Sequence, residues 1–270
     1  MNLKDKVAII TGASKGIGKA MAYILADEGC HIVCAARSVD KLEQVVAGIR
    51  AKGRRALAVG TDVSDRQSVQ RMVAAAMAEF GRIDILINNA GGPLAGIPGM
   101  ARPVNDSNEF FDVMEKMTFI NIDDTDWDLI FNINFYGAVY ATKAVLPIMM
   151  KQGSGHIINT SSKAGKIKAD IVPGMIAYAT AKGALSRFTE ALAYELMCEV
   201  SPIRVNAISP GNVAVTMHEN LPPEELEGYR KPEDIKDVLL FVLDEEKSVS
   251  GEIYGSETMK TWYREIQEGI

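Results

Sequence analysis

Cysteine is scarce in this chain of 270 residues, and long apolar runs are missing. Its three cysteines, Cys30, Cys34 and Cys198, are too few for a disulfide framework, which indicates a reducing compartment. No apolar run approaches the ~20 residues that a membrane-spanning helix requires. The few residues before the first apolar segment leave no room for a secretory leader. We therefore expect a cytoplasmic protein without a membrane partner.

Positive charge is also in deficit. The chain has 29 Lys and Arg against 35 Asp and Glu, a net charge of -6, and no basic run, which argues against a nucleic-acid partner. Only three histidines occur, and one of them, His31, lies between Cys30 and Cys34. On a strand the two cysteines point away from the face that carries His31, so the three cannot share an ion. We expect no metal site.

Short apolar segments alternate with helical ones through the first third of the chain. Buried strands are expected at Lys6–Thr11, His31–Ala36, Ala56–Val59 and Ile83–Ile87. Helices are expected at Gly16–Glu28 and Lys41–Lys52, and a third from the capping-box pattern of Ser64 and Gln67 to Phe80. This alternation predicts an α/β fold: one domain, residues 1–270, with a doubly wound, Rossmann-type, mostly parallel sheet and helices on both faces.

The alternation lapses at about residues 92–125 and then resumes. The later expected elements are a long helix Trp127–Met150, strands at Ile157–Thr160, Ile203–Ile208 and Glu252–Tyr254, a helix through Tyr178 to about Glu199, and a helix opening at Pro232. Within the insertion, Phe110, Phe111, Met114 and Met117 fit one face of a short helix. That helix could line a substrate cleft, contact another subunit, or pack on a core of its own.

A glycine-rich turn follows the first strand. Gly12 permits the tight turn, Gly16 lets backbone approach a ligand, and Gly18 lets the next helix pack closely on the sheet. The N–H groups at the start of that helix, with its dipole, suit a pyrophosphate. We predict that the cofactor-binding residues of this turn are Gly12, Ser14, Lys15, Gly16, Ile17 and Gly18.

Tyr178 and Lys182 lie four residues apart on an expected helix, so both face the same side. A free phenol titrates near pH ~10, and a cation within a few Å can lower that pKa by roughly 1–3 units. The spacing alone is common. Its context is not, because the chain also carries Thr11-Gly12-x-x-x-Gly16-x-Gly18 after the first strand and Asn88-Asn89-Ala90-Gly91 after the fourth. Together these motifs resemble the short-chain dehydrogenase/reductase family over nearly the whole chain outside residues 92–125 and the C-terminal end.

The resemblance implies catalytic roles for four residues. Tyr178 would be the general acid in carbonyl reduction, with Lys182 lowering its pKa and holding the nicotinamide ribose. Ser162 would hydrogen-bond the substrate oxygen, with Ser161 as the alternative. Asn134 would support a proton path to the lysine, or be a buried structural amide.

The resemblance also implies further cofactor contacts. Asp62 and Val63 match the adenine site, Asn89 and Gly91 the ribose side, and Pro210, Gly211, Val213 and Thr216 the nicotinamide side, although one extra residue puts Thr216 out of register. The end of the second strand lacks the carboxylate that selects NAD and has Arg37 and Ser38 instead, near Lys15. A guanidinium can bind a 2′-phosphate bidentately, so we predict NADP(H).

The resulting hypothesis is an NADP(H)-dependent carbonyl reductase that interconverts a ketone and a secondary alcohol. The apolar insertion favours a bulky, apolar or steroid-like ketone. The alternatives are a 3-oxoacyl-(acyl-carrier-protein) reductase and, from another class, a non-catalytic NADP-sensing protein. By analogy with the family we also expect a homodimer or homotetramer, paired through the Trp127 and Tyr178 helices.

Overall fold

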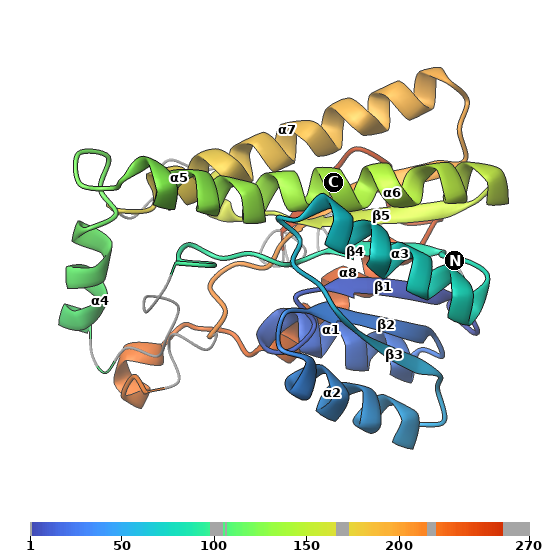
Figure 1. Cartoon of the computed structure of the whole chain (residues 1–270), viewed down its shortest axis with the longest axis horizontal. Coiled ribbons are helices and arrows are strands. Elements are labelled where there is room, and N and C mark those ends of the chain that lie inside the picture. The colour runs from blue at the N-terminus through green and yellow to red at the C-terminus, as the bar shows by residue number, and fades with distance from the viewer. Residues whose placement is uncertain (1, 98–104, 106, 166–172, 215–219, 256–270) are drawn as a thin grey trace, which may run out of the picture.

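The computed structural model describes residues 2–97, 105, 107–165, 173–214 and 220–255 (Figure 1). Their centre is a seven-stranded sheet in the order β3-β2-β1-β4-β5-β6-β7, in which each neighbouring pair is parallel. The strands are β1 Val7–Thr11, β2 His31–Ala36, β3 Ala56–Gly60, β4 Ile85–Asn88, β5 Gly155–Thr160, β6 Ile203–Ser209 and β7 Ile253–Gly255. The predicted doubly wound α/β fold is confirmed.

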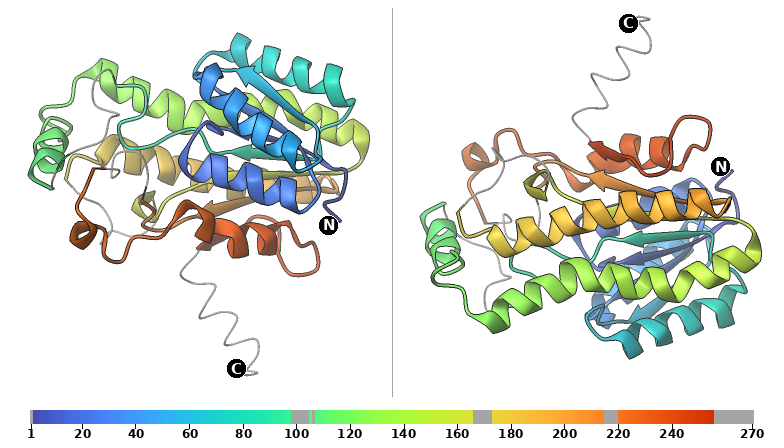
Figure 2. Two further views of the ribbon diagram at one scale, coloured as in Figure 1. Left: turned by 90° about the horizontal axis from the view of Figure 1, so that it is seen from below. Right: turned by 90° about the horizontal axis from the view of Figure 1, so that it is seen from above.

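Helices cover both faces of the sheet, as the two views of Figure 2 show. On one face lie α1 (Gly16–Asp27), α2 (Val39–Ala51) and α8 (Lys236–Leu243). On the other lie α3 (Arg66–Phe80), α6 (Gly137–Gln152) and α7 (Ile176–Cys198). Because side chains alternate along a strand, β1 sends Ala8 and Ile10 to the first face and Val7 and Ile9 to the second. All four are buried, as both faces of a covered parallel sheet require.

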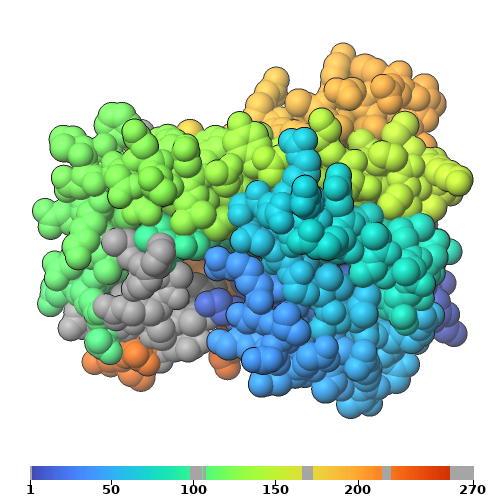
Figure 3. Space-filling view, viewed as in Figure 1, coloured from blue at the N-terminus to red at the C-terminus, as the bar shows by residue number. Residues whose placement is uncertain are grey.

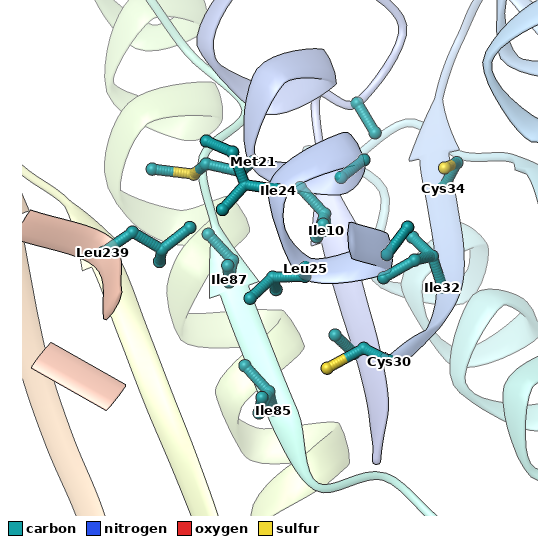
Figure 4. Close-up of a cluster of buried hydrophobic side chains, with 14 of the residues drawn as sticks. Ile10, Met21, Ile24, Leu25, Cys30, Ile32, Cys34, Ile85, Ile87 and Leu239 are labelled. Carbon is teal, nitrogen blue, oxygen red and sulfur yellow. The ribbon is translucent and has the colours of Figure 1, made fainter. Parts of the chain in front are cut away.

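The core beneath α1 is drawn in Figure 4, where Ile10, Leu25 and Ile87 meet between helix and sheet. Cys30 and Cys34 are buried in this cluster, and burial raises the pKa of each thiol to about 12. His31 instead stacks on Phe80. No cluster of three potential metal ligands occurs among the described residues. In the same residues, no helix combines the length and apolarity needed to cross a membrane.

Two expected helices differ from the prediction. The long helix is α5 (Asp124–Phe131), a π-helical segment η1 (Asn132–Tyr136) and then α6, which together carry the chain to Gln152. The third helix begins one residue later than the capping-box pattern indicates. Asp65, not Ser64, is its N-cap and accepts from the Gln67 N–H, whereas the Ser64 hydroxyl bonds the Asp62 carboxylate.

In the described part of the insertion, the helix α4 (Ser107–Glu115) lies at the end of the molecule beyond the strands' carboxyl ends (Figure 1). In the space-filling view its side chains form the left-hand end of the surface (Figure 3). Phe110, Met114 and Met117 pack inward as expected, but Phe111 is exposed. A 100° step per residue cannot place two consecutive phenylalanines on one narrow face.

Candidate active site

A crevice is expected where the connections from two adjacent strands diverge, and here that point lies between β1 and β4. The chain leaves β1 for α1 and leaves β4 for the insertion. The two turns meet at their backbones: a Cβ atom added at Gly12 would lie 2.9 Å from the Ala90 Cα. Only glycine permits so close an approach, so Gly12 joins the two halves of the crevice floor.

The glycine-rich turn is fixed by hydrogen bonds to the β4 side. The Thr11 hydroxyl accepts from the N–H groups of Asn89 and Ala90, at 2.9 and 3.1 Å. The Asn89 amide donates to the Thr11 carbonyl at 3.0 Å. Gly12 and Gly16 have φ of 69° and 54°, in the left-handed region that favours glycine. Gly18 is buried, and a Cβ there would lie 2.5 Å from the Asn89 amide nitrogen.

This turn has the features of a pyrophosphate cradle. α1 begins at Gly16 without a side-chain cap, and Lys15 is exposed beside its first turn. Ser14 and Ile17 are half-buried between them. A polar helix start bordered by residues without Cβ atoms is the site that a dinucleotide phosphate requires. The residues present therefore fit a nicotinamide dinucleotide.

The cation-bearing corner lies at the end of β2. Arg37 and Ser38 are both exposed there, and the Ser38 hydroxyl does not cap α2 although the residue occupies the N-cap position. Arg37 makes no hydrogen bond or ion pair with the residues that the structure describes. The guanidinium is therefore not committed to a carboxylate of this described part of the fold.

Asp62 and Val63 follow the carboxyl end of β3. The Asp62 carboxylate accepts from the Ser64 N–H and hydroxyl, at 2.9 and 2.6 Å, and so shapes the turn before α3. Val63 is buried against α6: a Cβ added at Gly137 would lie 2.9 Å from the Val63 Cβ. Asp62 thus has a structural task in the described fold, whatever contact it makes to an adenine ring.

Tyr178 is the third residue of α7, and its phenol shares a side-chain hydrogen bond with Ser162. Ser162 follows the carboxyl end of β5, and its oxygen also accepts from the Ala164 N–H at 3.2 Å. Ser161 is buried and paired with Ser186, at 2.7 Å between the two hydroxyl oxygens. Of the two candidate serines, Ser162 is therefore the one beside the tyrosine.

Lys182 lies one turn further along α7 and is almost fully buried. Its Nζ donates to the Thr160 carbonyl at 2.7 Å and lies 5.7 Å from the centroid of the Tyr178 ring. Burial lowers the pKa of this ammonium to about 8. The fold thus holds a cation next to the phenol that is much easier to deprotonate than an exposed lysine.

The pKa of Tyr178 differs from the sequence-based expectation, which had Lys182 lowering it. Burial raises this pKa, and the hydrogen bond with Ser162 opposes the rise. The reason is geometric, because the Lys182 ammonium bonds a backbone carbonyl of β5 instead of the phenol. Ser162, not Lys182, is the group that favours the phenolate here.

Asn134 lies in the π-helical segment and is buried. Its amide oxygen accepts from the Gly92 N–H at 2.9 Å, and its amide nitrogen donates to the Gly92 and Ile130 carbonyls, at 3.1 and 2.9 Å. The structural task of Asn134 is therefore plain. A Cβ at Gly91 would lie 3.2 Å from the Asn134 Cγ and 3.5 Å from the Lys182 Nζ. The Gly91 backbone thus lies between the Asn134 and Lys182 side chains.

The last group of predicted contacts follows β6. Pro210 and Val213 are buried, and Gly211 has a φ of 79°. Val213 pairs with Arg230, whose N–H donates to the Asn212 carbonyl at 2.8 Å. Thr216 lies outside the described residues.

A buried hydrogen-bond chain beneath the site was not predicted. The Asn88 amide donates to the Thr142 hydroxyl and the Asn159 amide oxygen, at 3.2 and 2.9 Å, and the Asn159 amide donates to the Thr189 hydroxyl at 2.9 Å. The chain links α6, β4, β5 and α7 just below Thr160. Two asparagines in apolar strands were the available signal, because buried amides require partners.

Apolar side chains from the insertion complete the surroundings of Tyr178. The cluster contains Leu94, Ile97, Met114, Met117, Ile130 and Ala177, with Tyr178, Trp127 and Met175 packed against it. The insertion therefore packs in a cluster that it shares with α5 and the start of α7, and Tyr178 packs against this cluster.

Comparisons with known proteins agree with this geometry. A family model described as short chain dehydrogenase matches residues 6–226. The 3-oxoacyl-(acyl-carrier-protein) reductase FabG of Thermotoga maritima is 31% identical over 265 residues, covering 94% of this chain and 97% of the relative.

Two solved structures have the same fold. A 7α-hydroxysteroid dehydrogenase complexed with NADH and 7-oxo glycochenodeoxycholic acid has a TM-score of 0.77 at 28% identity, covering 94% of each chain. A short chain dehydrogenase from Burkholderia cenocepacia in complex with NADP has a TM-score of 0.77 at 29% identity, covering 94% of this chain and 97% of the other. The chain belongs to the short-chain dehydrogenase/reductase family and is an oxidoreductase of that family.

Proposed function

We propose that this protein is an NADP(H)-dependent carbonyl reductase, which interconverts a ketone and a secondary alcohol. The observation that carries the proposal is the Tyr178–Ser162 hydroxyl pair with the buried Lys182 beside it, at the carboxyl ends of β4 and β5. Open α/β sheets bind their ligands at this edge. A sensor without turnover has no need of a desolvated phenol and ammonium together, which disfavours the non-catalytic alternative.

In reduction, Tyr178 donates its proton to the carbonyl oxygen, and Ser162 hydrogen-bonds the same oxygen and holds the phenol in place. A bound nicotinamide would supply the hydride for the carbonyl carbon. Lys182, whose ammonium donates to the Thr160 carbonyl, would hold the nicotinamide ribose. Asn134 keeps Gly91 and Gly92 in position beside that ammonium. These roles follow the family resemblance.

The preference for NADP(H) over NAD(H) is carried by the corner at the end of β2. Arg37 is exposed there, Lys15 is exposed in the β1–α1 turn, and no carboxylate stands at the position that would receive a ribose 2′-hydroxyl. A 2′-phosphate gains charge-assisted hydrogen bonds from a guanidinium. Solved relatives hold NADH in one case and NADP in another, so the preference rests on these residues of the present chain.

The substrate class follows from the apolar cluster beside Tyr178. Because Tyr178 packs against a cluster that contains Met114 and Met117, the site favours a bulky apolar ketone over a charged or sugar-like one. The relative crystallised with an oxo-steroid conjugate supports this class. The second candidate is 3-oxoacyl-(acyl-carrier-protein) reduction, which the similarity to FabG over nearly the whole chain favours.

The helices α6 and α7 carry aromatic and exposed apolar side chains that could form a subunit interface. Aromatic rings follow one another from α5 into α6, with Phe135 edge-on to Phe188 of α7 and Tyr136 stacked on Tyr140. Tyr194 and Met197 are exposed further along α7. We propose that two copies pair through α6 and α7, which lie side by side in Figure 2, in a cytoplasmic homodimer or a homotetramer.

Initial rates of NADPH and NADH oxidation across a ketone panel test the proposal. The panel should hold a steroid ketone, a small aliphatic ketone and a 3-oxoacyl thioester. We expect turnover with NADPH, highest on the steroid ketone. Faster turnover with NADH would overturn the cofactor assignment, turnover confined to the thioester would favour the second candidate, and none with any ketone would overturn the activity.

A further inference from the structure

We propose that the insertion is a positioning element for Tyr178: the carboxyl-terminal turn of α4 and the methionines Met114 and Met117 hold the first turn of α7 in the reactive register. The inference rests on the proposed function, in which Tyr178 is the proton donor. It extends that function to a segment that contributes no reacting group.

The first turn of α7 is weakly fixed by its own sequence. Tyr178 is the third residue of the helix, and the N-cap residue Met175 provides no side-chain cap. The first bond of the helix ladder in this turn runs from the Ala179 N–H to the Met175 carbonyl, at 2.7 Å. Helix ends without a cap fray more easily than capped ones. The position of this turn must therefore be set by its contacts with the rest of the fold.

One packing contact comes from the chain just after Ser162. Residues Lys163–Gly165 form a short 3-10 turn, η2, which lies directly on α7. A Cβ added at Gly165 would fall 2.6 Å from the Lys182 carbonyl carbon and 2.7 Å from the Gly183 nitrogen. This contact fixes the Lys182 turn of the helix but not the turn that carries Tyr178.

The second contact comes from the insertion and lies at the start of α7. Gly174 has a φ of 85°, and a Cβ there would fall 2.7 Å from the Met114 carbonyl carbon and inside contact distance of its oxygen. Backbone thus touches backbone between α4 and the residue before the Met175 cap. The side chains continue the contact, since Met114 and Met117 are buried in the cluster against which Met175 and Tyr178 pack.

The two contacts differ in whether they depend on the insertion. The η2 contact would exist in a chain without it, whereas the Gly174 contact and the methionine cluster depend on residues 107–122. Ser162 bonds the phenol itself, and the insertion supplies the backbone contact at the start of the Tyr178 turn. A displacement of about 1 Å at a reacting group can lower a rate by about 10²-fold.

Gly174→Ala tests the inference, because the added methyl group must push α4 away from the start of α7. The matched control is Gly53→Ala. Gly53 has a similar φ of 77° with no atom within 4 Å of an added Cβ, so it reproduces the backbone strain without the contact. Both variants are compared with the wild-type protein in kcat on the best ketone of the panel, in Kd for NADPH, and in amide hydrogen exchange of residues 176–180.

We expect Gly174→Ala to lower kcat by about 10²-fold and to speed exchange in the first turn of α7, with the Kd for NADPH unchanged. Gly53→Ala should match the wild type in all three. Wild-type kcat in a folded Gly174→Ala protein would overturn the inference, as would a loss of NADPH affinity as large as the loss of kcat.

Should Gly174→Ala fail to fold, Met117→Ala and Met117→Leu take its place. The cavity left by Ala should lower kcat, and the similar volume of Leu should restore it; equal kcat in the two variants would overturn the inference. Tyr178→Phe separates this inference from the proposed function. If that variant retains turnover, the proposed function fails, whereas an inactive Tyr178→Phe with a fully active Gly174→Ala removes the inference alone.

Discussion

The two ends of the parallel sheet bury charge in opposite ways. At the amino ends of the strands, the Asp84 carboxylate, 2% exposed, receives the Val7 N–H at 2.9 Å, the Arg82 guanidinium at 2.8 Å and the Lys6 ammonium at 3.3 Å. At the carboxyl ends, the Lys182 ammonium, 3% exposed, has the Thr160 carbonyl and no carboxylate among the described residues.

The pKa shifts report this difference. Burial acts to raise the pKa of Asp84, but the hydrogen bonds from Arg82 and Val7 and the charge of Lys6 outweigh it, and the pKa is lowered. Burial lowers the pKa of Lys182 to about 8 with no opposing ion pair. The amino end therefore compensates its charge and stabilises the fold. The carboxyl end leaves a cation uncompensated, at a cost in stability that its chemistry explains.

Tyr178→Phe should break the chemistry of the carboxyl end and leave its structure intact. Loss of a general acid lowers kcat by about 10²–10⁴-fold, and the Kd for NADPH should not change. Tyr254→Phe is the matched control, because burial also raises the pKa of that phenol, whose oxygen accepts from the Val249 N–H at 2.8 Å. Steady-state kinetics and fluorescence titration measure both variants. Turnover retained by Tyr178→Phe would contradict the assignment.

Arg37→Asp should reverse the cofactor preference. The substitution removes the charge-assisted hydrogen bonds proposed for the 2′-phosphate and adds a repelling carboxylate, so the ratio of kcat/KM for NADPH to that for NADH should fall by about 10²-fold or more. Arg71→Asp, on the exposed surface of α3, is the control. An unchanged ratio would show that the cations at the carboxyl end are not binding groups.

Asp84→Asn should destabilise the charge cluster at the amino ends of the strands and leave kcat unchanged. Removing one member of a buried charge cluster lowers the free energy of unfolding by about 3 kcal/mol, measured by urea denaturation at pH 7. The stabilising effect of a lowered carboxyl pKa is present above its unfolded value of about 3.9 and is lost as pH falls through the native value. The difference between the proteins should therefore shrink in acid. A lower kcat in a fully folded Asp84→Asn protein would contradict the assignment of stability to the amino ends and of chemistry to the carboxyl ends of the strands.

Lys182→Met should abolish turnover and yet raise the free energy of unfolding by about 1 kcal/mol at pH 7. Removal of the buried charge stabilises the fold, and loss of the bond to Thr160 offsets part of that gain. The wild-type native pKa of about 8 lies below the unfolded value. The penalty is thus complete below the native pKa and disappears as pH rises toward ~10.4. Denaturation of both proteins across this range measures it. A Lys182→Met protein that is less stable at pH 7 would contradict the comparison.

Local patterns predicted the fold better than the site. The β1–α1 turn and the alternation to Phe80 depend on glycine placement and on apolar periodicity, both of which are local in sequence. The π-helical segment Asn132–Tyr136 does not follow from local periodicity, and it contains Asn134, which bonds Gly92, 42 residues away. Phe111 is exposed, contrary to the prediction, because consecutive helix residues point about 100° apart and Phe110 already occupies the buried face.

Within the site, Tyr178, Ser162 and Lys182 could be named from motifs, and their roles stay predictions. The motifs could not show which partner each side chain bonds. In the structure Ser161 bonds Ser186 and Lys182 bonds the Thr160 carbonyl, and the pKa of Tyr178 is raised, opposite to the expected shift. Such choices depend on tertiary contacts that no spacing encodes.

Transfer of a labelled hydride tests the central claim most directly. The protein is given NADPH with deuterium at the transferable position of nicotinamide C4 and the best ketone of the panel, and the alcohol is analysed by mass spectrometry. The wild-type protein should place the deuterium on the carbinol carbon, and Tyr178→Phe should yield almost no alcohol. Binding of NADPH without labelled alcohol from any ketone, or equal labelling by both proteins, would contradict the account.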